Sequence, residues 1–103
     1  MQRTEIARSL AQRLLKSKPN DQQRMDLLFQ LLASRKPTKI ERAACLNLLQ
    51  QMTERFNKAK QDAEAFLKVG DSPRDESLPA VQLAAWTQVA VTVLASDIAI
   101  TLY

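Results

Sequence analysis

Glycine is almost absent from this sequence, with one residue in 103, and proline occurs only four times. Tight β-turns depend on glycine or asparagine at positions of positive φ, so this chain has few places where a hairpin can form. Its hydrophobic fraction of 46% and charged fraction of 25% are typical of a globular protein. We therefore expect a single all-α domain over residues 1–103.

Histidine is absent, and Cys45 is the only cysteine. The first absence removes the commonest metal ligand and acid–base side chain, and the second excludes an intramolecular disulfide or a multi-cysteine zinc site. Cys45 lies in an apolar run, where we expect a buried and unreactive thiol. The sequence therefore predicts a protein that is not an enzyme and that holds no metal or cofactor.

Four carboxylates are the remaining candidates for hydrolytic chemistry or for binding Ca²⁺, namely Asp71, Asp75, Glu76 and Asp97. The first three share a segment that lacks the alternating ligands and the glycine of a calcium-binding loop, so we interpret it as a solvated acidic loop. Asp97 is expected within the apolar last helix, and a carboxylate buried there needs a partner. We expect that partner to be an arginine.

Positive charge is concentrated in the first part of the chain. Residues 1–60 carry 13 Lys and Arg against 5 Asp and Glu, whereas residues 61–103 carry 2 against 6. A basic surface of Arg35, Lys36, Lys39 and Arg42 suggests, as an alternative function, a small basic nucleic-acid-binding helical protein. We do not expect nucleic acid, because the following helix is too long for a recognition helix and Glu41 would meet the phosphates.

Hydrophobic periodicity predicts four main helices in a bundle-like or orthogonal array. The first runs from about Thr4 to Ser17, and the second, capped by Asn20 or Asp21, stops before Pro37. The last begins at Pro79 and extends nearly to the C-terminus.

The third helix is predicted to be the longest. Thr38 followed by Glu41 is the spacing of a capping box at its start, and Gly70 suits a left-handed residue at its end. One apolar stripe is expected along it, and we leave open a break near residues 60–62, although no proline marks one. The stripe consists of Ile40, Ala44, Leu48, Leu49, Met52, Phe56, Ala59, Ala63 and Phe66.

The C-terminal helix is apolar on nearly all sides, which predicts a buried helix with Trp86 as a core anchor. It either fills its own core or docks against another part of a parent protein, and it offers a surface for homo-oligomers. A membrane tail anchor is the alternative. We expect no membrane span, because polar side chains interrupt every apolar run and no basic residues flank the segment.

The segments LLASRKPTKIERAACLNLLQ and FLKVGDSPRDESLPAVQLAAWTQVAVTVLASD resemble planctomycete-specific domain one. The family has an arginine, a proline and a threonine before a glutamate, matched here by Arg35, Pro37, Thr38 and Glu41. A run of small residues followed by Trp and Thr is matched by residues 84–87, and a later leucine and aspartate by Leu94 and Asp97. The chain departs from the family at Ser34, where glycine is common, and at Ala95 and Ile98 beside the aspartate.

This resemblance implies a domain of unknown function at the C-terminal end of a larger protein. Such domains follow a second planctomycete-specific domain and often a cytochrome-c-like domain, so the parent protein is expected to be exported or periplasmic. The haem signature C-x-x-C-H is absent from this chain. The N-terminal segment has no apolar core of a signal peptide, which predicts a cytoplasmic protein or an excised piece. We expect a structural or protein-interaction module that binds other domains of its parent or another protein.

Overall fold

The computed structural model describes residues 3–68 and 77–95, and all regular structure in these ranges is helical. The predicted all-α class is confirmed, with five described helices in place of four. The Cα radius of gyration of 12.8 Å is that of a compact domain of this length. The helices are α1 (Arg3–Ser17), α2 (Asp21–Ala33), α3 (Lys39–Lys58), α4 (Lys60–Leu67) and α5 (Ala80–Leu94).

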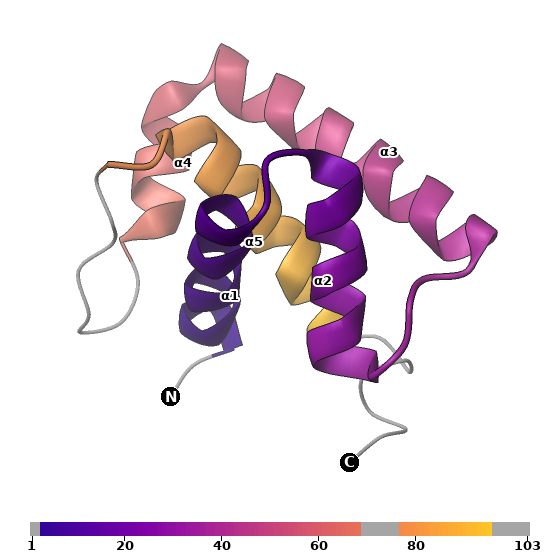
Figure 1. Ribbon diagram of the computed structural model, residues 1–103. Coiled ribbons are helices and arrows are strands. Elements are labelled where there is room, and N and C mark those ends of the chain that lie inside the picture. Colours follow the sequence, from indigo (N-terminus) through magenta and orange to yellow (C-terminus); the bar gives the residue numbers. More distant parts are fainter. Residues whose placement is uncertain (1–2, 69–76, 96–103) are drawn as a thin grey trace.

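Helix α5 lies in the middle of the molecule, surrounded by the other helices (Figure 1). It contacts all four of them, because its sequence is apolar on nearly every side. Its described residues thus fill the core of this domain. The buried ones are Leu83, Ala84, Ala85, Trp86, Thr87, Val89, Ala90 and Val93.

The polar groups buried with α5 have hydrogen-bond partners. Trp86 is 1% exposed, and its indole Nε1–H donates to Oδ1 of Asp21, 3.3 Å away in the first turn of α2. The hydroxyl of Thr87 donates to the carbonyl of Leu83 one turn earlier, at 2.7 Å. Both side chains therefore enter the core without leaving a donor unsatisfied.

Helix α1 packs against α5 through Ala7, Ala11 and Leu14, all fully buried. Between these residues lies a buried charge that the sequence did not lead us to expect. Arg8 is 2% exposed, and its Nη1 donates to the carbonyl of Leu67 at 2.8 Å. Carbonyls in the last turn of a helix lack intrahelical partners and carry the negative end of the helix dipole. Arg8 therefore ties α1 to the end of α4.

The predicted long third helix is divided at Ala59, which has φ −137° and ψ 70°. The rings of Phe56 and Phe66 stack with centroids 5.9 Å apart and an interplanar angle of 16°. Ten residues span about 15 Å along a continuous helix, so the rings can meet only because the chain turns back at Ala59. Helix α3 therefore ends at Lys58, and α4 follows it without a proline between them.

Helix α2 is capped at its C-terminal end by Ser34, the one described non-glycine residue with positive φ (φ 57°, ψ 26°). Its backbone N–H donates to the carbonyl of Gln30 at 3.2 Å and closes the last turn. A side chain with a Cβ in this left-handed conformation costs about 1–2 kcal/mol. Gly70, which the sequence placed at a similar position, lies outside the described residues, as do Asp71, Asp75, Glu76 and Asp97.

We predict that Ser34→Gly stabilises the protein. Glycine removes the cost of positive φ but adds entropy to the unfolded chain, which leaves a net gain of about 0.5–1 kcal/mol, or a few degrees in Tm. Thermal unfolding followed by circular dichroism measures it. The matched control is Ser9→Gly, on an exposed serine inside α1, which should lower Tm. A lower Tm for Ser34→Gly would contradict the assigned conformation.

Arg8→Met is expected to destabilise the fold by about 1.5–3 kcal/mol, because it keeps an apolar stem but removes the donor to Leu67. Denaturant unfolding of this variant measures the loss. Arg13→Met provides the control, since Arg13 is an exposed arginine of the same helix and should change stability by less than about 0.5 kcal/mol. Equal effects of the two substitutions would show that the buried hydrogen bond contributes nothing.

Candidate interaction surface at the α2–α3 junction

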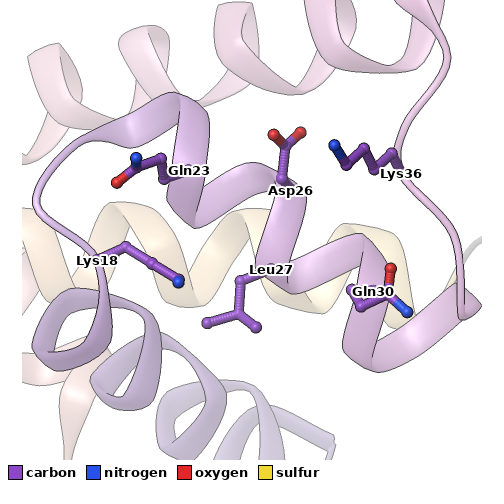
Figure 2. Close-up of a pocket in the computed structure, with 6 residues that line it drawn as sticks. All are labelled: Lys18, Gln23, Asp26, Leu27, Gln30 and Lys36. Carbon is purple, nitrogen blue, oxygen red and sulfur yellow. The ribbon is translucent and has the colours of Figure 1, made fainter.

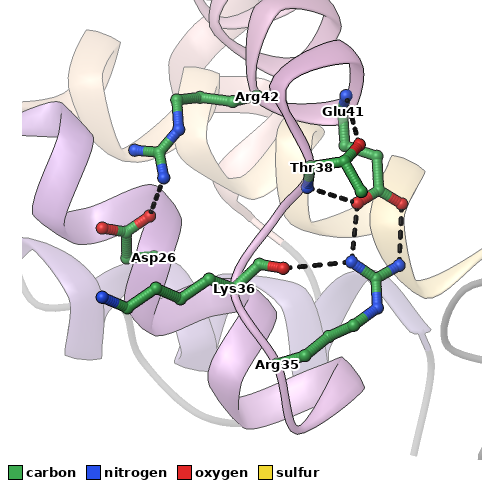
Figure 3. Close-up of polar contacts among 6 residues, drawn as sticks. All are labelled: Asp26, Arg35, Lys36, Thr38, Glu41 and Arg42. Atoms are coloured by element: carbon green, nitrogen blue, oxygen red, sulfur yellow. Dashed lines mark hydrogen bonds and ion pairs between the residues drawn. The ribbon is translucent and has the colours of Figure 1, made fainter.

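The segment between α2 and α3 is held by Arg35. Its guanidinium donates two hydrogen bonds to the carboxylate of Glu41, from Nη1 to Oε1 at 2.7 Å and from Nη2 to Oε2 at 2.9 Å (Figure 3). Nη1 also donates to the carbonyl of Lys36 at 3.0 Å. Pro37 lies in this segment and is buried, although its neighbours Lys36 and Thr38 are exposed. The segment thus has a fixed path from α2 to α3.

The capping box predicted from the sequence is present at the start of α3. The backbone N–H of Glu41 donates to Oγ1 of Thr38 at 3.2 Å, and the N–H of Thr38 donates to Oε1 of Glu41 at 2.8 Å. The hydrogen bonds from Arg35 and then from Thr38 lower the pKa of Glu41 to about 2. Glu41 therefore joins the helix cap to the preceding segment.

A second ion pair joins α3 to α2. Nη2 of Arg42 lies 2.7 Å from Oδ1 of Asp26, and each side chain is 31% exposed (Figure 3). The sequence carries no signal for this pair, because sixteen residues and a chain reversal separate its members. Arg35 and Arg42, which we expected on an open basic surface, are thus each neutralised by a carboxylate. Lys36 and Lys39 are exposed, and no ion pair joins them to a carboxylate in the described part of the chain.

The start of α3 departs from the predicted apolar stripe. Ile40 is 83% exposed, and Ala43 and Ala44 are also exposed. The expectation that the stripe points its apolar side chains at the core was wrong for Ile40 and Ala44. We call the exposed side chains of Ile40, Ala43 and Ala44 the Ile40 surface.

The reason lies in the helical repeat. Each step of four residues turns the side-chain direction by about 40°, so a series at i, i+4 and i+8 winds around the helix. From Ile40 to Phe56 there are four such steps, or about 160°. Phe56 and Leu49 are buried, and Ile40 consequently lies on the opposite side of α3. The four-residue spacing therefore could not keep Ile40 and Phe56 on one side of the helix, because the side-chain direction rotates with each step.

An open hollow of ≈ 280 Å³ lies on the outer side of α2, next to this junction (Figure 2). Leu27 and Lys18 line it, and the side chain of Lys36 reaches from the segment after α2 toward Asp26. Asp26 also lines it but is paired with Arg42. The amides of Gln23 and Gln30 complete the lining. The hollow is therefore bordered by two lysines without ion-pair partners in the described structure.

Cys45 lies one turn after Glu41 on α3. Cys45 is half-buried, less than expected, and burial followed by the nearby charge of Glu41 raises the pKa of its thiol, which disfavours the nucleophilic thiolate. Among residues 3–68 and 77–95, no three His, Cys, Asp or Glu side chains come together as a metal site. No helix in these ranges has both the length and the hydrophobicity needed to cross a bilayer.

Comparison with protein-family models, with curated proteins and with solved structures finds no match for this chain. The resemblance to planctomycete-specific domain one therefore stays a prediction from the residues that carry it.

The contribution of Glu41 to stability is predicted to depend on pH. Because its folded pKa is about 2 and its ordinary value is 4.5, the contribution is complete above pH 4.5 and is lost as the pH falls towards 2. Glu41→Gln should cost about 1 kcal/mol at neutral pH, and its Tm should converge with that of the wild type across this window.

Thermal unfolding at a series of pH values measures that convergence. Glu54→Gln, on an exposed glutamate further along α3, is the control and should remain parallel to the wild type. A constant difference in Tm between Glu41→Gln and the wild type from neutral to acid pH would count against the role of the Arg35–Glu41–Thr38 contacts.

Proposed function

We propose that this protein is a non-catalytic helical interaction module that binds a protein partner through the Ile40 surface. The observation that carries the proposal is a large β-branched side chain, 83% exposed, at the start of a helix whose position is fixed by several polar contacts. Tyrosine and tryptophan are the commonest anchors of interfaces, but an exposed aliphatic group beside small residues also allows close helix packing.

The rigidity of the junction supports this role. The capping box, the bidentate Arg35–Glu41 pair and the Arg42–Asp26 pair fix the first turns of α3, although this end of the helix buries little apolar surface. A binding surface that is ordered before it meets its partner loses less conformational entropy on association. The contacts therefore prepare the Ile40 surface for binding at a low entropic cost.

The partner surface that we propose is on α3 and not on the C-terminal helix. Helix α5 is buried among the other four helices, so its described residues offer little area to another domain or to a second copy. The larger parent protein implied by the resemblance remains part of the proposal, and its other domains are natural partners for such a surface.

The alternative of nucleic-acid binding receives less support. Binding to nucleic acid, specific or not, depends on several Lys and Arg side chains that form no ion pair within the protein and can contact successive phosphates. At this junction Arg35 and Arg42 are neutralised by carboxylates, and the exposed centre of the face is Ile40, which offers no hydrogen bond to a phosphate. A protein partner therefore fits this surface better.

Selection from a random peptide library displayed on phage tests the proposal. Peptides selected on the wild-type protein are expected to lose binding to Ile40→Asp by about tenfold or more, since a carboxylate at the centre of the contact must be desolvated. Because Ile40 is exposed and lies in the first turn of α3, the aspartate should leave Tm unchanged or raise it slightly.

The matched control is Gln51→Asp, since Gln51 is exposed about three turns further along nearly the same side of α3. It should retain the selected peptides. Peptides that bind both variants as well as the wild type, or the absence of any selected peptide, would refute the Ile40 surface as the binding site.

A further inference from the structure

We propose that the partner of the Ile40 surface is an acidic segment of a protein, with an apolar side chain that packs on Ile40 and carboxylates that pair with Lys36, Lys39 and Lys18. This inference rests on the proposed function and adds the chemical class of the partner. The observation behind it is that some charged side chains around the α2–α3 junction form ion pairs and others do not.

The acids of the junction are already neutralised, and two of its cations are not. Glu41 is held by Arg35 and Asp26 by Arg42. Lys36, before α3, and Lys39, in its first turn, are exposed and form no ion pair with a described carboxylate. A partner carboxylate that approaches Lys39 therefore meets no unpaired acid of this junction. The surface next to Ile40 has a net positive charge, and an acidic partner is its electrostatic complement.

Lysines without ion-pair partners in the described structure also border the hollow on α2, on the side of α3 where Arg42 meets Asp26. Lys36 belongs both to the segment that leads into α3 and to the rim of the hollow, and Lys18 lies at the other end of that rim (Figure 2). The aliphatic floor at Leu27 and the amides of Gln23 and Gln30 suit the methylenes and carboxylate of a glutamate side chain. In this proposal one acidic side chain of the partner occupies the hollow beside these lysines.

The same charges disfavour the other occupants of this face. A second copy of the chain placed symmetrically on the Ile40 surface would bring its Lys36 and Lys39 against those of the first copy. Nucleic acid is disfavoured because Arg35 and Arg42 are already paired with carboxylates and the exposed side chain of Ile40 cannot bind a phosphate. An acidic segment with an apolar side chain satisfies both the lysines and Ile40.

Fluorescence anisotropy with a labelled helical peptide tests the inference. The probe carries leucine on one face and glutamate on the others, and its comparison peptide has glutamine in place of every glutamate. The acidic peptide should bind at least about fivefold more tightly than the glutamine peptide at low salt, and the preference should fall as salt is added. A short DNA duplex is titrated in parallel.

Two double variants locate the binding. Lys36→Gln with Lys39→Gln should weaken the acidic peptide about fivefold and leave the glutamine peptide unchanged, and adding Lys18→Gln should weaken it further. Lys58→Gln with Lys60→Gln is the matched control, since both lysines are exposed at the far end of α3 and the start of α4, and it should have little effect.

The outcomes separate this inference from the proposed function. If the peptides selected from the library depend on Ile40 but are not acidic, or if both double variants weaken the acidic peptide equally, the acidic partner is wrong and the Ile40 surface stands. If binding depends on neither Ile40 nor the lysines, both proposals fail. Tighter binding of the DNA duplex, lost in the Lys36 and Lys39 variant, would replace the acidic partner with nucleic acid.

Discussion

The fold depends on the burial of α5 on all sides. A helix that is apolar around its whole circumference cannot rest on a single neighbour, because one contact leaves the opposite side in water. The other four helices all contact α5, and each therefore presents only one apolar side to the centre. Trp86 fixes the register of this arrangement, since its ring is buried while its indole N–H must reach Asp21 at the start of α2.

Short-range features were the ones that the sequence alone could predict. The capping box of Thr38 and Glu41 uses contacts three residues apart, and the buried C-terminal helix follows from its composition. The division at Ala59 could not be placed, because it depends on Phe66 returning to Phe56 across the turn. Arg8 was missed for the same reason, since its acceptor at Leu67 is 59 residues away.

The candidate surface was found only in part. The sequence singled out Arg35, Lys36, Lys39 and Arg42 as basic, but it gave no means to tell which of them pair with carboxylates. Glu41 is near Arg35 in sequence, whereas Asp26 meets Arg42 only after the chain reverses between α2 and α3. The exposure of Ile40 was hidden by a spacing of four residues, which drifts around a helix of about 3.6 residues per turn.

The polar contacts at the junction and the exposure of Ile40 belong to one physical arrangement. Helix α3 packs on α5 through residues near Leu49 and Phe56, so its first turns extend past the edge of the core and gain little from apolar burial. Without other contacts these turns would fray, as helix ends do. The capping box satisfies the backbone N–H groups of Thr38 and Glu41, Arg35 holds the Glu41 carboxylate, and Arg42 anchors the helix to Asp26. Polar interactions thus hold in place a helical turn whose outward side chain, Ile40, is 83% exposed, so that most of the free energy available from burying it is not gained within the described structure.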